Sequence, residues 1–239
     1  MTDPVNLWVY LSTTPLFWLS LTIISYAVAL RFARMLNSHP AANPILLASS
    51  LIIIVLLKTR TSYSAYFEGA QFVNFLMGPA TVAIAVPIYR HRAVLRQVLV
   101  PMAGALFVGA IVAMISALGI GTLCGLPSEL LIDLAPKSVT AAVAMALTKQ
   151  MGGTPSITML LVMFTGIFGA VVVTPLMNFL GIRNYAARGF AVGLTSHGVG
   201  TARAFSVSTV AGLFAAIAMG LNAVVTALIL PWIVTLFLK

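Results

Sequence analysis

Long uncharged apolar runs constrain this chain more than any other feature of its sequence. The segment from Gln97 to Leu126 contains no charged residue, and neither does the run from Ala204 to Leu238. A membrane-spanning helix needs about 20 consecutive apolar residues, because the hydrocarbon core of a bilayer is about 30 Å thick. Only 7% of the residues are charged, whereas a soluble domain has about 25%. The sequence therefore predicts an all-α polytopic membrane protein.

The length and the basic residues indicate how the chain crosses the membrane. At about 20 residues per crossing plus connections, its 239 residues accommodate about seven or eight transmembrane helices, and we treat residues 1–239 as one transmembrane domain. Most of the Lys and Arg residues lie in short connections, where they orient the chain. The segment Pro136–Gln150 either crosses fully or re-enters the membrane from one side. The positive-inside bias favours the re-entrant interpretation.

The stretch from Gly189 to Ser208 is unusually polar for a membrane helix. Between Arg188 and Lys239, Arg203 is the one charged residue and His197 the one histidine. We predict that the glycines at 198 and 200 break a helix and that a new helix begins at Thr201. Such a restart has unpaired backbone N–H groups and a partial positive charge at its start. The stretch therefore predicts an anion site inside the membrane.

A short internal match suggests that this break occurs twice. Gly78-Pro79-Ala80-Thr81 aligns with Gly198-Val199-Gly200-Thr201, and both place a glycine three residues before a threonine that opens an Ala-rich helix. Pro136-Lys137-Ser138-Val139 is a third related stretch. The matches predict two halves, 14–120 and 128–238, which form an inverted repeat with one broken helix each. Secondary transporters place their binding site where such halves meet.

Each candidate site residue has a functional and a structural interpretation. Arg203 either neutralises a carboxylate through paired hydrogen bonds or braces the backbone at the break. Thr81 and Thr201 are natural helix caps that also offer substrate contacts, and Lys137 beside Ser138 is interpreted as an interface marker. The predicted substrate-binding residues are Thr81, Ser138, Ser196, His197, Gly198, Gly200, Thr201 and Arg203.

Proton coupling has two candidates. His197 has a reference pKa of about 6.5, so it is suited to carry a proton, although it also suits a bracing role at the break. Glu68 is the second candidate because it precedes the first predicted break. All three of Glu68, Glu129 and Asp133 are also interpreted as loop or interface charges. Isolated glycines such as Gly189 are interpreted as sites of close helix packing.

Enzyme motifs are missing from the sequence. The stretch from Gly193 to His197 places Thr195 where a G-x-S-x-G elbow needs its nucleophile. The chain has one cysteine and no HExxH motif, so no metal site is expected. We therefore expect neither enzyme activity nor a cofactor. The net charge of +9 does not indicate nucleic-acid binding, because most of the basic residues lie in the connections.

Three stretches of the sequence resemble the LrgB/CidB family: LMGPATVAIAVPIYR (Leu76–Arg90), APKSVTAAVAMALTKQMGG (Ala135–Gly153) and ARGFAVGLTSHGVGTARA (Ala187–Ala204). The resemblance implies a multi-pass protein of the bacterial inner membrane that acts with a small holin-like partner of the LrgA or CidA type. Members of the family are named as antiholin-like modulators of murein hydrolase activity and cell lysis. Relatives include carriers of small monocarboxylates such as pyruvate, and the plastid glycolate/glycerate transporter.

Two functions follow from this resemblance as expectations. The first is a secondary transporter of small monocarboxylates. The second is a non-transporting regulator of murein hydrolase activity and lysis. A homo-oligomer is expected by analogy, because so small a carrier needs an anchored scaffold if part of it moves.

Overall fold

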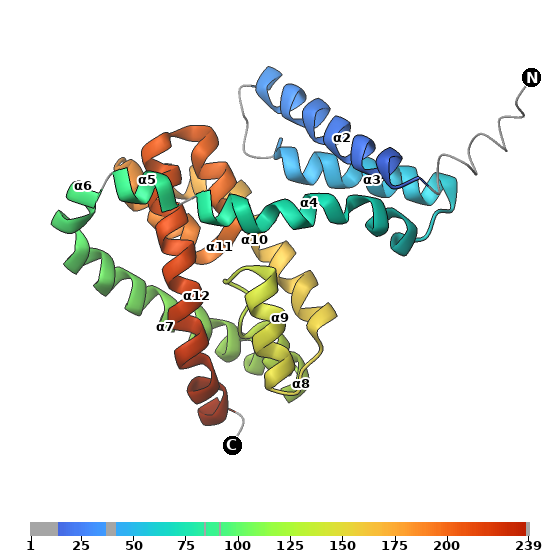
Figure 1. Ribbon diagram of the computed structural model, residues 1–239. Coiled ribbons are helices and arrows are strands. Elements are labelled where there is room, and N and C mark those ends of the chain that lie inside the picture. The colour runs from blue at the N-terminus through green and yellow to red at the C-terminus, as the bar shows by residue number, and fades with distance from the viewer. Residues whose placement is uncertain (1–13, 37–41, 84, 91, 238–239) are drawn as a thin grey trace, which may run out of the picture. The chain divides into compact units, whose positions relative to one another are not determined.

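The computed structural model describes residues 14–36, 42–83, 85–90 and 92–237 (Figure 1). All regular secondary structure in this part of the chain is α-helical. Four of its helices are long and apolar enough to cross a membrane: α2 (Pro15–Met35), α7 (Leu99–Leu123), α10 (Pro155–Phe179) and α12 (Thr209–Phe237). The prediction of a helical membrane protein is thus confirmed. Seven or eight crossings and the inverted repeat stay predictions.

The chain forms two compact units, Met1–Val86 and Pro87–Lys239. This boundary lies inside the first of the halves expected at 14–120 and 128–238, and those halves stay a prediction. The second unit contains α7 and α10–α12. The core clusters formed by the described residues all lie in this unit.

The first unit packs α2 against α3 (Pro44–Thr59) and α4 (Tyr63–Ala83). Trp18 on α2 is 1% exposed, and a methyl group at Gly69 on α4 would lie 2.7 Å from its Cβ. Gly69 therefore permits the close approach of the two helices. The hydroxyl groups of Thr22 and Tyr66 lie 3.1 Å apart and add a polar link between them.

Helix α4 does not break where the sequence predicted. It runs from Tyr63 to Ala83 with Pro79 inside it, so the expected restart at Thr81 is wrong. Membrane helices tolerate Gly and Pro in their interior, because local adjustments and neighbouring groups satisfy the freed backbone groups where water does not compete. The side chain of Thr81 lies outside the described part of the structure.

Helix α12 forms the centre of the second unit. Its residues from Ala211 to Ala218 are all buried. One core cluster joins α12 to α7 and to α11 (Tyr185–Val207) through residues such as Leu106, Phe190 and Phe214. A second cluster lies further along α12, where Leu230 packs with residues of α7, α8 (Ser128–Leu134) and α9 (Ala141–Gln150).

Glycines set the distance between α11 and α12. A methyl group at Gly189 would collide with the carbonyl group of Ala211, and one at Gly193 would collide with that of Ala215. Small residues four positions apart let two membrane helices approach closely. The packing interpretation of the isolated glycines is thereby confirmed for this pair.

The segment with α8 and α9 is too short for a full crossing. Helix α9 has 10 residues, which span about 15 Å at 1.5 Å per residue, and this is half the thickness of the hydrocarbon core. Its length supports the re-entrant interpretation of Pro136–Gln150.

Asp133 fixes this segment to the start of α10. It was expected to be a loop or interface charge, but it is 1% exposed. Its Oδ1 accepts a hydrogen bond of 2.6 Å from the backbone N–H of Thr154. The carboxylate therefore satisfies a backbone donor at a helix start, where no intrahelical partner exists.

Candidate functional site

Helix α11 is broken, as the sequence predicted, but the break lies just before the glycines. Ser196 has φ −126° and ψ 19°, and His197 has φ 40° and ψ −133°. A positive φ is strained for a residue with a side chain and costs about 1–3 kcal/mol. The second half of α11 therefore starts next to Gly198, and the expected restart at Thr201 is wrong.

The two halves of α11 fold back on each other. In a continuous helix Val192 and Ala204 would lie about 18 Å apart along the axis, yet both belong to one buried cluster. Gly200 permits this approach, because a methyl group there would lie 2.7 Å from the carbonyl oxygen of Val192. Helix α11 is therefore a helical hairpin whose tip is formed by Ser196 and His197.

His197 is held by contacts with α10. The residue is 4% exposed, and its Nε2 lies 2.9 Å from the carbonyl oxygen of Val162. A carbonyl oxygen only accepts, so Nε2 donates this hydrogen bond. A methyl group at Gly166 would lie 2.6 Å from Cε1 of the ring, so this glycine makes room for the imidazole. These contacts support the bracing role, and proton transfer by His197 stays a prediction.

Thr201 does not cap a helix. Its Oγ1 donates a hydrogen bond of 2.7 Å to the carbonyl oxygen of His197, whereas an N-cap side chain accepts from backbone N–H groups. Thr201 thus satisfies a backbone acceptor at the tip of the hairpin. Gly198 at the same tip is exposed, and a methyl group there would meet only the Sδ of Met219, at 4.0 Å.

Two of the predicted site residues, Ser138 and Ser196, line one cleft of about 970 Å³ within the second unit. The walls come from α7, α10, the first half of α11 and the turn between α8 and α9. Most of the lining is apolar and includes Phe164 and Phe168. The polar lining residues are Ser116, Lys137, Ser138, Thr165, Thr195 and Ser196.

Asn222 joins the turn at Ser138 to the last helical turn before the α11 break. Its Nδ2 lies 2.9 Å from the carbonyl oxygen of Leu194, in the last turn before the hairpin tip, and 3.4 Å from that of Ser138. Asn222 is 1% exposed and lies near the middle of α12. The sequence reasoning missed this residue. Its signal was an amide in an otherwise apolar run, since polar side chains in a membrane helix usually bond across helices.

Among the described residues that line the cleft, Lys137 is the one with a charged side chain. Within the described part of the chain, its ammonium group has no hydrogen bond or ion pair. The sequence reasoning interpreted Lys137 as an interface marker, because only the fold shows that its turn faces this cleft. An unpaired cation against an apolar wall favours an anionic ligand.

The hydroxyl groups of the cleft differ in what they offer a ligand. Thr165 and Thr195 each donate to a carbonyl oxygen of their own helix, at 2.8 Å and 2.9 Å. Ser196 lies 3.3 Å from Thr195 and must donate in that pair, because the Thr195 proton is already used. Ser138 is 8% exposed, and its hydroxyl group has no partner among the described residues. Donors for a ligand therefore come from Lys137 and Ser138.

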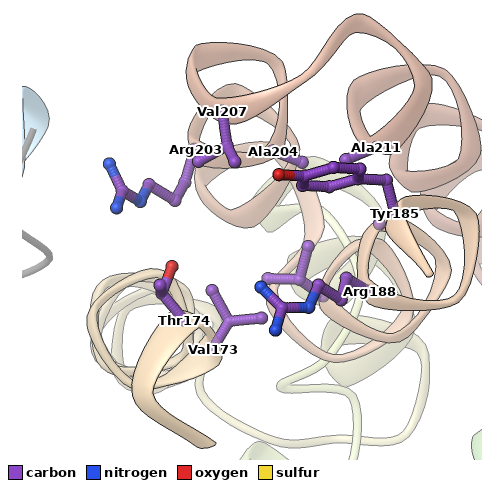
Figure 2. A pocket seen from close by; sticks show the side chains of 10 residues that line it. Val173, Thr174, Tyr185, Arg188, Arg203, Ala204, Val207 and Ala211 are labelled. Atoms are coloured by element: carbon purple, nitrogen blue, oxygen red, sulfur yellow. The ribbon is translucent and has the colours of Figure 1, made fainter. Parts of the chain in front are cut away.

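Arg203 and Glu68 are the two charged residues among the predicted site and proton-coupling residues. Arg203 does not line the cleft but a small second pocket that also contains Arg188 (Figure 2). Glu68 is exposed on α4 in the first unit, the unit that also contains Thr81. The roles of Arg203 in substrate binding and of Glu68 in proton coupling stay predictions.

Comparison with known proteins gives the family. The model of the LrgB-like family matches residues 22–236. The Holin-like protein CidB of Staphylococcus epidermidis is 31% identical over 217 residues, which cover 91% of this chain and 94% of that protein. The Uncharacterized protein YxaC of Bacillus subtilis is 32% identical over 217 residues, with 91% and 94% covered.

A further relative is the Holin-like protein CidB of Staphylococcus aureus, which is 29% identical over 222 residues, with 93% of this chain and 96% of that protein covered. No solved structure matches the chain. The family match, the relatives and the apolar helices agree with one another. The chain is therefore a multi-pass bacterial membrane protein that belongs to the LrgB-like family.

Proposed function

We propose that this protein is a secondary transporter of small monocarboxylates, with Lys137 as the counter-charge of the substrate carboxylate. The observation that carries the proposal is the unpaired ammonium group of Lys137 in an apolar cleft. A cation in such surroundings is costly to keep without a partner, and in membrane proteins it usually marks a substrate or ion pathway. A bound carboxylate offsets that cost.

The chemistry of the lining narrows the substrate class. A single cation matches one carboxylate better than two. Phe164 and Phe168 offer apolar contacts to a short carbon chain. Thr165 and Thr195 keep free lone pairs, which suits them to accept from a substrate hydroxyl group. We therefore expect pyruvate, lactate, glycolate and glycerate to be better ligands than dicarboxylates.

The backbone around the cleft suits alternating access. The hairpin tip and the turn at Ser138 are both irregular. Near the middle of α12, Asn222 bonds to this turn and to Leu194, in the helical turn before the tip. Transporters place such irregular segments at the substrate site near the midplane of the bilayer. We propose that these two segments move together when the cleft changes sides. His197 and Glu68 are the proposed proton-coupling residues, and no chemical conversion of the substrate is proposed.

Uptake into proteoliposomes tests this function. The purified protein should accumulate radiolabelled pyruvate, lactate, glycolate or glycerate above the level of empty liposomes, with unlabelled monocarboxylates competing and a dicarboxylate competing poorly. Each substrate should be tested with and without a proton gradient, and with and without a co-expressed holin-like membrane protein. Absence of uptake for all four acids under every condition would reject the transport function.

A second candidate function is control of murein hydrolase activity and lysis together with a holin-like LrgA/CidA-type partner. The names of the CidB relatives favour it, because they call those proteins holin-like. The two functions differ in their dependence on the cleft. A Lys137→Met variant should lose transport under the first function, whereas a lysis phenotype that needs only the assembled protein should survive this substitution.

A further inference from the structure

The described residues that line a second pocket of this protein include two arginines and no acidic residue. Its walls come from the end of α10, the start of α11 and the returning half of the α11 hairpin (Figure 2). Arg188 and Arg203 both line it, together with the hydroxyl-bearing side chains of Thr174 and Tyr185. The fold-back of α11 creates this pairing, because the two arginines would otherwise lie about 22 Å apart on one helix.

Arg188 is fixed in place by protein groups. Its Nε donates a hydrogen bond of 2.6 Å to the carbonyl oxygen of Ile182, and its Nη2 donates to Oδ1 of Asn178. Both acceptors are neutral, so the charge of Arg188 is not compensated by them. A guanidinium group has five N–H donors, and these two bonds leave the others available to a ligand.

No hydrogen bond joins the side chain of Arg203 to another described residue. Its Nε is buried and has no hydrogen-bond partner among the residues that the structure describes. Buried N–H groups of this kind are nearly always satisfied in folded proteins, so one without a protein partner indicates a bound water, ion or ligand. Two uncompensated guanidinium groups beside one pocket select an oxyanion.

The size and position of the pocket further limit the class of ligand that it can bind. Its free volume of about 30 Å³ holds about two waters, so it takes a single oxyanion group and not a whole organic molecule. The pocket lies where α10 ends and α11 begins, beside the connection from α11 to α12. Helix ends of a membrane protein lie near the lipid headgroups, where basic pockets bind anionic lipids.

We propose that Arg188 and Arg203 form an oxyanion site that is distinct from the cleft and takes a phosphate or carboxylate group, supplied either by an anionic lipid headgroup or by a soluble anion. Val173 and Val192 line both this pocket and the cleft, whereas Arg188 and Arg203 line the pocket alone. The site does not depend on transport, because none of its charged residues lines the cleft.

Thermal unfolding of the purified full-length protein tests the site with two kinds of probe. In one arm, phosphatidylglycerol is titrated into micelles that contain phosphatidylcholine. In the other arm, sodium phosphate and sodium acetate are titrated at constant ionic strength without anionic lipid. Stabilisation by the lipid alone identifies a headgroup site, and stabilisation by the salts identifies a site for soluble oxyanions.

Arg203→Gln is the decisive variant, because it removes the charge without breaking any hydrogen bond recorded for the described residues. Its apparent affinity for the effective probe should fall about tenfold, the scale of one lost charged hydrogen bond. The apparent affinity of the Arg203→Lys variant should fall less. Arg183→Gln is the matched control, since Arg183 is exposed and does not line the pocket, and it should respond as the wild type does.

Either of two results would overturn the proposal. The first is that no probe stabilises the wild-type protein more than phosphatidylcholine or sodium chloride does. The second is that the Arg203→Gln or Arg203→Lys variant binds the effective probe with wild-type affinity. Should Arg203→Gln fold poorly, the Lys variant carries the same comparison. Neither result depends on uptake, so the transport function is judged separately.

Discussion

Asn222 connects the turn at Ser138 to the end of the first half of α11. Its amide donates to the carbonyl oxygens of Leu194 and Ser138, and it is almost fully buried. Asn222→Leu should leave both acceptors without this donor, and a buried unsatisfied group costs about 1–3 kcal/mol. The midpoint of thermal unfolding in detergent should therefore fall.

Thr226→Val is the comparison for this prediction. It removes only a longer bond of 3.4 Å, from Thr226 Oγ1 to Asn222 Oδ1, and should destabilise less than Asn222→Leu. If Asn222→Leu unfolds at the wild-type temperature, Asn222 does not hold the two segments.

His197 shows why the position of the helix break could not be predicted from the sequence. Local preference places a break on glycine, so the prediction centred on Gly198 and Gly200. The strained backbone is instead at His197, because the carbonyl oxygen of Val162 and the space at Gly166 hold its ring. Both partners belong to α10 and lie far away in the sequence. The existence of the break was therefore predictable, but its position was not.

At the scale of elements, the α11 hairpin gives a matched pair of substitutions. Gly200→Ala would place its methyl group 2.7 Å from the carbonyl oxygen of Val192, whereas the same change at Gly198 meets nothing nearer than 4.0 Å. Overpacking of this kind typically costs about 1–3 kcal/mol. Gly200→Ala should lower the yield of folded protein and its unfolding temperature, and Gly198→Ala should leave both unchanged. Equal behaviour of the two variants would contradict the hairpin.

Helix α4 shows the limit of matching short motifs. Gly78-Pro79-Ala80-Thr81 resembles the sequence at the α11 break, yet α4 continues through it to Ala83. The break in α11 depends on what packs around it, namely α10 at His197 and Asn222 of α12 at Leu194. A four-residue match carries no information on such partners. Apolar run length, in contrast, is a local property, and it correctly indicated the long helices.

For the whole molecule, the site could be predicted only in part. Ser138 and Ser196 were expected in the site, and they line one cleft. Lys137 was interpreted as an interface marker, because nothing local distinguishes a lysine in a loop from one in a cleft. Arg203 attracted attention as an isolated charge, but the fold-back of α11 places it with Arg188 in another pocket. Such placements depend on tertiary packing between distant segments.

The most direct test of the account is monocarboxylate uptake by Lys137→Met, measured in proteoliposomes beside three other proteins. These are the wild type, Lys149→Met and Arg203→Gln. Lys149 is a suitable control because it is exposed on α9 and does not line the cleft. At equal folded yield, Lys137→Met should lose about 2–3 kcal/mol of substrate affinity, as expected for an unmade hydrogen bond to a charged group, and Lys149→Met should transport as the wild type does. Wild-type affinity in Lys137→Met would contradict the account. Loss of affinity in Arg203→Gln beside it would assign the counter-charge to Arg203.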